Sequence, residues 1–347
     1  MCKELYSSCT QCPRKCGADR NSGKCGFCGE STEVRVAVAC LHFGEEPLIT
    51  VHGGSGTIFL TGCTLRCAFC QNYQISQNGI GRAVSSEEFT QICLKLQNAG
   101  AENINLVTGS HAIPKLAEYI KNAKENGCSI PFCWNSSAFE SVEMLELLKP
   151  YVTIWLPDLK TLNSQLAGKL FAAPEYPEAA VKAISWMIQN NPIKIESAKA
   201  SKDYTDANGE KIIKGEEREK MTQGVIIRHL FMPGKFSETA DVLGWLKENA
   251  DGRAIISLMN QYTPVPFSED AGQLESRKKS LSAIENRLVT PQEDSDLQDL
   301  IEAFDFEMLF YQELTDDTSW LPDFTRTQPF SNKLAKPSWH WNKGFLN

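Results

Sequence analysis

Along most of the chain, two patterns of apolar and polar residues take turns. Short apolar runs predict buried strands, and between them apolar residues recur at the spacing of helix turns. The predicted strands are TIFLTG from Thr57, NINLVT, SIPFCW, YVTIWLP, GVIIRHLF, AIISLMNQY and FEMLFYQ. The predicted helices are SSEEFTQICLKLQNAG, AIPKLAEYIKNAKENG, SVEMLELLK and the segments near 177–190, 236–249 and 290–304.

This alternation of strand and helix predicts βαβ units and a parallel sheet. Ser85 and Glu88 stand at capping-box spacing, which marks the start of the first helix. The strand pattern is strong in six runs, and FEMLFYQ is a weaker seventh. Since a closed TIM barrel has eight strands, we expect an α/β fold with an incomplete, (β/α)6-type TIM-like barrel.

Three segments depart from the alternation. Residues 1–30 are rich in cysteine and poor in aliphatic side chains, which predicts a metal-binding appendage. Residues 31–314 would form the barrel domain, with a highly charged stretch at 191–222 that predicts a surface excursion or a flexible loop. Residues 315–347 contain several prolines and three tryptophans, and we expect them to wrap the domain surface.

Composition narrows the class of protein. Of the 347 residues, 42% are hydrophobic and 22% are charged, and the net charge is −8. No apolar run is long enough to span a bilayer, and the polar opening MCKELYSSCTQCPRKC does not read as a signal peptide. We therefore expect a cytoplasmic protein without a membrane partner. No basic stripe interleaved with aromatic residues indicates a nucleic-acid partner either.

The thirteen cysteines are unevenly distributed. In a long cytosolic chain, clustered cysteines more often bind metal than form disulfides. Cys63, Cys67 and Cys70 follow the first predicted strand, at the end where barrels of this kind keep their chemistry. Three thiolates can hold three corners of a cubane iron–sulfur cluster, and an open coordination position is typical of catalytic metal sites. A zinc knuckle with a distant fourth ligand, or unrelated surface thiols, are the alternatives.

The stretch GCTLRCAFCQNYQIS resembles the CxxxCxΦC signature of the radical S-adenosylmethionine superfamily, with Phe69 as the aromatic residue. The wider chain resembles one branch of that superfamily, the iron–sulfur proteins related to pyruvate formate-lyase activating enzyme. The matching segments, in the order of that branch, are HFGEEPLI, GSGTIFLTGC, CQNYQIS, NINLVT, LPDLK, IIRHLFMPG and SLMNQYTP.

The resemblance implies that Cys63, Cys67 and Cys70 hold a [4Fe–4S] cluster whose open iron binds S-adenosylmethionine. One electron would then cleave the sulfonium, and the resulting 5′-deoxyadenosyl radical would abstract a hydrogen atom from a substrate. The protein's share is to position the cofactor and exclude competing reactions.

The resemblance also implies cofactor-binding residues after the predicted strands: Thr108, Gly109, Ser110, Asn135, Ser136, Asp158, Lys160 and Arg228. Arg228 is chemically suited to grip a carboxylate. Without the resemblance, Asp158 and Lys160 could equally be a solvated pair, and Arg228 a structural ion-pair residue.

The histidines carry less information. His111 occupies a position that is usually acidic in activating enzymes, so no side-chain role is carried over to it. His229 follows Arg228 and therefore points to the opposite face of its strand, which predicts a core histidine. His42 and Glu45 have no assigned chemistry and are possible supports for the cluster loop.

The N-terminal cysteines follow the spacing C-x2-C-x3-C-x8-C-x2-C. Paired C-x2-C turns suit tetrahedral zinc, whereas four such thiolates suit a second iron–sulfur cluster that relays electrons equally well. In the resembling proteins the matching four are Cys9, Cys12, Cys16 and Cys28, and Cys25 is the weaker candidate.

These features favour a radical S-adenosylmethionine oxidoreductase. Its activity could be the installation of a glycyl radical on a partner, as in activating enzymes, or radical modification of another protein or a small molecule. The alternative classes are a non-catalytic iron–sulfur electron-transfer module and a zinc-dependent binding protein. The missing fourth cysteine argues against an electron carrier, which needs no open iron. Expected partners are a protein or small-molecule substrate and a one-electron donor such as flavodoxin or ferredoxin.

Overall fold

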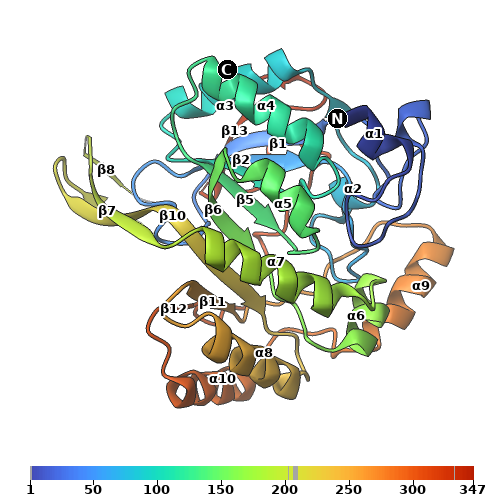
Figure 1. The fold of residues 1–347 in the computed structure, drawn as a ribbon. Coiled ribbons are helices and arrows are strands. Elements are labelled where there is room, and N and C mark those ends of the chain that lie inside the picture. Colours follow the sequence, from blue (N-terminus) through green and yellow to red (C-terminus); the bar gives the residue numbers. More distant parts are fainter. Residues whose placement is uncertain (1, 202, 206–209, 332) are drawn as a thin grey trace.

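The computed structural model describes residues 2–201, 203–205, 210–331 and 333–347. Positions 202 and 206–209 of the charged stretch are outside the described residues. Figure 1 shows the fold, in which helices pack along a strongly twisted sheet.

In the described part of the chain, the main sheet has twelve strands, and seven of them form its parallel region. Its two ends, β12 and β14, are not paired with each other, so the sheet stays open. The incomplete barrel predicted from the sequence is confirmed, and the weak seventh run forms a short strand. The parallel strands are β2 (Ser55–Leu60), β4 (Ile104–Val107), β5 (Phe132–Ser136), β6 (Val152–Pro157), β10 (Glu217–Leu230), β11 (Ile255–Met259) and β12 (Leu309–Tyr311).

The helices predicted from apolar periodicity are present. Ser85 caps the first of them by accepting a hydrogen bond from the Glu88 backbone N–H at 3.2 Å, as its position predicts. The six helices are α3 (Ser86–Asn98), α4 (Ile113–Glu125), α5 (Val142–Leu148), α7 (Tyr176–Asn190), α8 (Phe236–Asn249) and α10 (Pro291–Phe304).

Two further helices, α6 (Ser164–Phe171) and α9 (Ala271–Leu281), are absent from the sequence prediction. Only Leu281 of α9 is buried, so this helix has almost no apolar stripe to recognise. The short α6 begins at Asn163, whose side chain accepts hydrogen bonds from the backbone of Gln165 and Leu166. Both helices lie beside the cysteine loop and contribute to its support.

Antiparallel strands extend the sheet beyond β2. Strand β1 (Arg35–His42) pairs with β2 on one side and with β13 (Ala335–His340) on the other, and β14 (Gly344–Phe345) pairs with β13. The short β3 (Arg82–Ala83) also pairs with β1. Part of the segment 315–347, which the sequence predicts to wrap the domain surface, thus also joins the sheet. Strand β1 was not predicted, although both of its faces are buried in apolar clusters.

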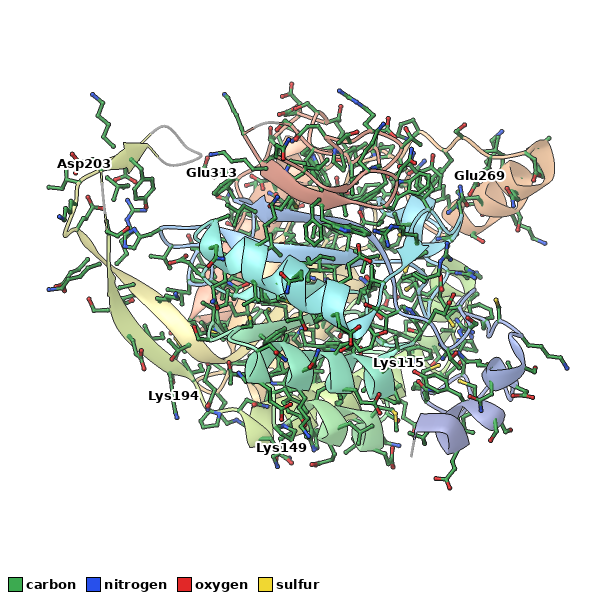
Figure 2. The ribbon with its side chains drawn as sticks, turned by 90° about the horizontal axis from the view of Figure 1, so that it is seen from above. Lys115, Lys149, Lys194, Asp203, Glu269 and Glu313 are labelled. Atoms are coloured by element: carbon green, nitrogen blue, oxygen red, sulfur yellow. The ribbon has the colours of Figure 1, made fainter. Side chains whose placement is uncertain are left out.

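The described residues of the charged stretch form a surface arm, which is one of the two alternatives predicted from the sequence. Strand β7 (Lys194–Lys199) pairs antiparallel with the first half of β10, and β8 (Tyr204–Thr205) pairs with β9 (Lys211–Ile212). The arm projects from the barrel, away from the N-terminal segment (Figures 1 and 2). Almost all of β7 is exposed, so its strand has no buried face and lacks the apolar alternation that sequence reasoning needs.

The N-terminal segment contains little regular structure. It comprises α1 (Cys2–Ser7), a 3-10 turn at Arg20–Ser22 and connecting loops. A further short helix, α2 (Tyr73–Ser76), follows the cysteine loop. Among the described helices, none combines the length and apolar character needed to cross a lipid bilayer.

Candidate functional site

The three-cysteine loop runs from the end of β2 to α2 and is fixed through its backbone. The N–H of Arg66 donates to the Phe171 carbonyl at 3.1 Å, and the N–H of Ala68 donates to the Leu170 carbonyl at 2.8 Å. Helix α6 therefore holds the loop from one side. On the other side, Arg277 of α9 donates to the Ala68 carbonyl at 3.0 Å.

Aromatic packing fixes the side chain between the last two cysteines. Phe69 is buried and contacts Phe171 and Tyr262 edge to face, with ring centroids 6.0 and 5.7 Å apart. This anchor turns the intervening backbone toward the core, while Cys63, Cys67 and Cys70 remain partly accessible. The aromatic position of the signature thus has a packing role in this chain.

Burial raises the pKa of the Cys63 thiol to about 11, despite the nearby positive charges of Arg66 and Lys160. Burial raises the pKa of Cys67 as well, and Lys160 opposes this effect. In the described part of the chain, no three His, Cys, Asp or Glu side chains lie close enough to share one metal ion. The ligands of a cubane bind separate irons, so the donor set of this loop, three thiols beside positive charge, fits a cluster.

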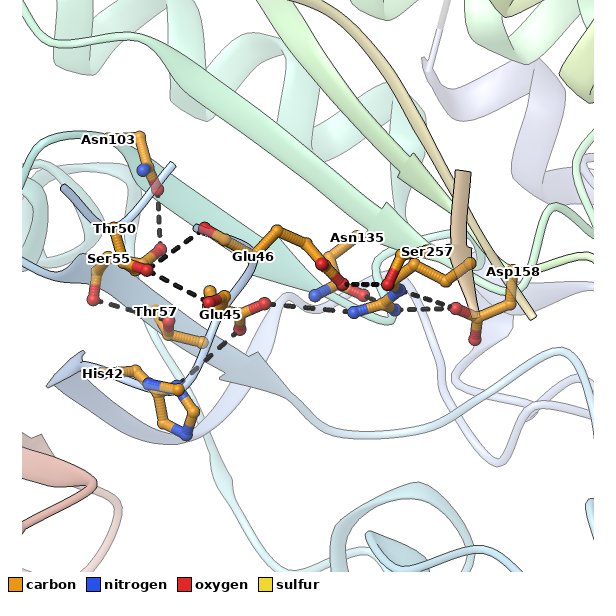
Figure 3. A network of polar contacts seen from close by, with 12 residues as sticks. His42, Glu45, Glu46, Thr50, Ser55, Thr57, Asn103, Asn135, Asp158 and Ser257 are labelled. Atoms are coloured by element: carbon orange, nitrogen blue, oxygen red, sulfur yellow. Dashed lines mark hydrogen bonds and ion pairs between the residues drawn. The ribbon is translucent and has the colours of Figure 1, made fainter. Parts of the chain in front are cut away.

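A partly buried ion-pair network lies at the carboxyl ends of neighbouring strands (Figure 3). Asp158, directly after β6, accepts from Arg228 Nε at 2.9 Å through Oδ1 and from Lys160 Nζ at 2.7 Å through Oδ2. Arg228 Nη2 donates to the Asn135 side-chain oxygen at 2.6 Å. Four residues of the predicted cofactor site are thus brought together from β5, β6 and β10.

The charges of this network stabilise one another. Burial alone would raise the pKa of Asp158, but Arg228 and Lys160 outweigh it and hold the pKa below its ordinary value. For Lys160, burial lowers the pKa, and the attraction of Asp158 outweighs that effect and raises it. Asp158 is therefore a carboxylate and Lys160 an ammonium group across the physiological pH range.

Two glutamates of the loop between β1 and β2 approach the same arginine. Glu45 lies 3.9 Å from Arg228 Nη1, and Glu46 accepts a hydrogen bond from Ser257 Oγ at 3.1 Å. Burial raises the pKa of Glu46, although Arg228 opposes the rise. His42 lies 3.9 Å from Glu45, and because burial lowers its pKa, it faces Glu45 as a neutral imidazole near pH 7.

The segment after β4 is held in a strained conformation. Thr108 has a φ of 63°, which is rare for a β-branched residue and points to a functional constraint. Its N–H donates to the Asn135 carbonyl at 2.9 Å. At Gly109, a Cβ would lie 2.6 Å from the Trp134 indole, so close packing excludes larger residues there.

Two predicted residues turn instead toward a buried carboxyl group. Ser110 Oγ donates to Glu140 at 2.5 Å, and Ser136 also contributes to holding this carboxyl. Burial nevertheless raises the pKa of Glu140. Ser110 and Ser136 therefore lie behind the ion-pair network and support the two loops that carry Thr108 and Asn135.

The two histidines at the sheet edge are both buried. His229 bonds to the Leu159 carbonyl at 2.6 Å and to Thr239 Oγ1 at 2.9 Å, so the predicted core histidine is confirmed. Burial lowers its pKa to about 4. His111 points away from the network and lines a cavity in the N-terminal segment, where Cys9, Cys12, Cys16 and Cys28 are also found. Cys25 is exposed and outside the lining of this cavity.

Sequence reasoning missed several residues that complete the site, namely Glu46, Ser257, Glu140 and Arg277. Glu46 lies within the matching segment HFGEEPLI, which was a usable signal. Ser257 pairs with Arg228 across the parallel strands β10 and β11, which only the register reveals. Glu140 and Arg277 act through contacts between distant segments.

The fold and the site define a partial (β/α) barrel with three clustered thiols and a partly buried ion-pair network at the carboxyl edge of its sheet. The chain is similar to the Radical SAM superfamily, whose family model matches residues 57–195. Proteins of this superfamily use a [4Fe–4S] cluster and S-adenosylmethionine in radical reactions.

One relative is the uncharacterized protein MJ0674 of Methanocaldococcus jannaschii, which is 27% identical over 318 residues, covering 89% of this chain and 79% of the relative. A similar solved structure is Streptococcus suis SuiB bound to S-adenosylmethionine, with 13% identity and a TM-score of 0.47 over 72% of this chain and 48% of SuiB. The match thus spans about half the length of SuiB. Another is a domain of pyruvate-formate lyase-activating enzyme from Bacteroides vulgatus, with 11% identity and a TM-score of 0.35 over 58% of this chain and 91% of that domain.

Proposed function

We propose that the chain binds a [4Fe–4S] cluster through Cys63, Cys67 and Cys70 and cleaves S-adenosylmethionine reductively to abstract a hydrogen atom from a substrate. The observation that carries the proposal is the position of the three-thiol loop, which leaves β2 at the sheet edge that also holds the Asp158 network. When bound, the cluster and S-adenosylmethionine supply the electron and the 5′-deoxyadenosyl radical.

The protein's own residues position the cofactor. Arg228 is bonded to Asp158 and Asn135 through two of its five N–H donors, and the remaining donors would contribute to gripping the cofactor carboxylate. Lys160 uses one of its three N–H donors in the hydrogen bond to Asp158. Its remaining donors, with the Asn135 amide, would hold the carboxylate of the methionine moiety. Thr108, Gly109 and the supporting Ser110 and Ser136 shape the wall beside them.

The substrate is a protein or a small molecule that gives up a hydrogen atom. Activation of a glycyl-radical enzyme, as by pyruvate formate-lyase activating enzyme, stays a prediction, because substrate recognition resides in loops that differ between proteins of one fold. The reaction needs a one-electron donor such as flavodoxin or ferredoxin. Thiol ligands suit a reducing compartment such as the cytoplasm.

The N-terminal segment binds a second metal centre in this proposal. Its candidate ligands are Cys9, Cys12, Cys16 and Cys28, whose thiols line one cavity. An all-thiol donor set matches the ligand chemistry of both zinc and an iron–sulfur cluster. Since no three of the described thiols lie close enough to share one metal ion, the geometry favours a cluster. Cys25 serves as a matched control, because it lies in the same segment but outside the cavity.

The test is anaerobic reconstitution with iron and sulfide, followed by reduction in the presence of S-adenosylmethionine and chromatography of 5′-deoxyadenosine. We expect product from the wild type and from Cys25→Ser, and none above background from Cys67→Ala. A wild-type protein that carries a stable cluster but forms no 5′-deoxyadenosine would contradict the proposal and favour the electron-transfer module.

A further inference from the structure

The N-terminal cavity joins parts of the chain that are far apart in sequence. Its lining includes the thiols of Cys9, Cys12, Cys16 and Cys28, together with Thr64 from the cysteine loop and His111 from the loop after β4. An added Cβ at Gly26 would lie 3.3 Å from the sulfur of Cys16 and 3.4 Å from that of Cys28. The sulfurs of Cys16 and Cys28 therefore both lie close to the backbone at Gly26.

Buried polar atoms in the cavity wall lack hydrogen-bond partners among the described residues. Both side-chain atoms of Gln11 are in this state, as are Thr64 Oγ1 and His111 Nδ1. The exposed fraction of Gln11 is 1%, and that of His111 is 2%. Buried polar groups are nearly always satisfied in folded proteins, and an unsatisfied group can mark an absent ion. A bound group with hydrogen-bond acceptors would satisfy the Gln11 amide.

The cavity shares a wall with the three-cysteine loop. The backbone N–H of Cys63 donates to the carbonyl of Cys28 at 3.3 Å, so one hydrogen bond links a candidate ligand of each site. Arg14 Nε donates to the Thr64 carbonyl at 2.6 Å. Arg20 Nη1 donates to the His111 carbonyl at 2.7 Å. The segment is thus docked on the two loops that follow β2 and β4.

The cysteines of the cavity differ in exposure. Cys9 and Cys28 are buried, Cys12 is intermediate and Cys16 is exposed. One side of the site therefore reaches the protein surface, and the other side meets the Cys63 loop. A structural zinc ion does not require a site that is exposed on one side and in contact with the Cys63 loop on the other. In a redox centre, the same position provides a route for electrons from the surface to that loop.

We propose that Cys9, Cys12, Cys16 and Cys28 ligate a second [4Fe–4S] cluster, through which electrons reach the cluster of the Cys63 loop. The electron comes from a low-potential one-electron donor of the flavodoxin or ferredoxin class. The donor is oxidised by one electron and the N-terminal centre is reduced by one, then reoxidised as it passes that electron on. No covalent bond or proton changes place in this transfer. The inference rests on the proposed function, since it assumes the first cluster.

The test uses the full chain, reconstituted anaerobically, in four forms: wild type, Cys25→Ser, a Cys12→Ser/Cys16→Ser double variant and Cys67→Ala. Iron, sulfide and zinc are measured, and electron paramagnetic resonance spectra are recorded after dithionite reduction, with and without S-adenosylmethionine. We expect about eight irons in wild type and Cys25→Ser, and about four in each of the other two forms. Reduction by flavodoxin should be slowed several-fold in the double variant.

The spectra separate failure of this inference from failure of the proposed function. The double variant should keep a signal that changes with S-adenosylmethionine, which also shows that it is folded, and Cys67→Ala should lose that response. If the double variant does not fold, the single change Cys16→Ser at the exposed side of the site provides the same comparison. Stoichiometric zinc in wild type that disappears in the double variant, or a double variant that keeps all its iron, would overturn the inference.

Discussion

The three-cysteine loop and the N-terminal segment present clustered thiols in two different ways. The loop takes its position from the barrel: it leaves β2, and its backbone is bonded to α6 and α9. The N-terminal segment has only a six-residue helix and a 3-10 turn of its own. It is held in place mainly by the side chains of Arg14 and Arg20, which donate to carbonyls of the barrel and of neighbouring loops.

The difference teaches that the three-cysteine loop is positioned by the barrel fold, whereas the N-terminal cysteines are positioned by contacts that dock their segment on the barrel. Disturbing the barrel should affect both, whereas disturbing the docking contacts should affect only the N-terminal segment. Two arginines, the partly buried Arg228 in the barrel and the buried Arg20 in the segment, allow this comparison directly.

Replacing the barrel arginine should have the largest effect on stability. Arg228→Met leaves Asp158 with Lys160 as its bonded cation and removes the positive charge that lies 3.9 Å from Glu45. Removing one partner of a fully buried ion pair costs about 3–5 kcal/mol, and the partial exposure of this pair should place its cost toward the lower end. Urea denaturation of the apo-protein should show this loss in the free energy of unfolding, and 5′-deoxyadenosine formation should fall with it. A stability close to that of the wild type would show that the network is not the support of the site.

The segment arginine should have a local effect that leaves the free energy of unfolding of the barrel nearly unchanged. Arg20 donates to the Ser31 carbonyl at 2.9 Å and to the His111 carbonyl at 2.7 Å, and hydrogen bonds from charged groups contribute about 1.5–3 kcal/mol each. In Arg20→Met, limited proteolysis should cut within residues 2–30 while the barrel stays intact. Simultaneous cleavage of both regions would mean that the segment is part of the cooperative barrel unit.

Gly62 lies at the junction between the two regions. Its φ is 84°, and an added Cβ would lie 2.4 Å from Glu30 Cγ and 3.0 Å from the Cys28 carbonyl oxygen. Gly62→Ala should cost about 1–2 kcal/mol for the left-handed backbone alone, with a further cost for the contact. Hydrogen exchange should increase in both cysteine regions, in contrast to Arg20→Met. Faster hydrogen exchange in only one of the two cysteine regions would contradict this expectation, because it would show that Gly62 does not couple them.

The pH dependence of His229 tests the barrel side by itself. Its folded pKa is lowered to about 4 from 6.5 by burial, with Asp158 and Lys160 as neighbouring charges. Between these two values the unfolded chain binds more protons, so stability must fall as the pH falls from 6.5 toward 4.

Each pH unit within this window corresponds to about 1.4 kcal/mol for one fully shifted group. His229→Gln should therefore flatten the plot of unfolding free energy against pH by up to that slope. Parallel plots for the wild type and the variant would show that His229 does not titrate as its burial implies.

The sequence was sufficient to predict the parallel barrel, because apolar residues recur with one spacing in its strands and with another in its helices. Helix α8 was predicted with the same bounds, and the strand ends correctly grouped Asn135, Asp158 and Arg228. The sequence was insufficient for α9 and β7, because these elements bury almost no side chains and therefore show no periodic pattern of apolar residues. It also did not reveal strand β1, or its pairing with a strand nearly three hundred residues away.

Within the site, the residue types were predictable but their partners were not. Arg228 is bonded to Asp158, a partner that the sequence did not indicate, and its contact with a cofactor carboxylate stays a prediction. The bond between Cys63 and Cys28 has no signature in either motif, because a backbone contact between two loops depends on how the whole chain packs. For the same reason, His111 gave no hint that it lines the N-terminal cavity.

The most direct test of the central claim is whether S-adenosylmethionine binds the cluster held by Cys63, Cys67 and Cys70. The measurement is the electron paramagnetic resonance spectrum of the reduced Cys12→Ser/Cys16→Ser variant, in which that cluster is the one expected to remain, before and after addition of S-adenosylmethionine. A changed spectrum upon addition is the predicted result, because the cofactor would bind the iron that has no cysteine ligand. An unchanged spectrum from a fully reduced cluster would contradict the account.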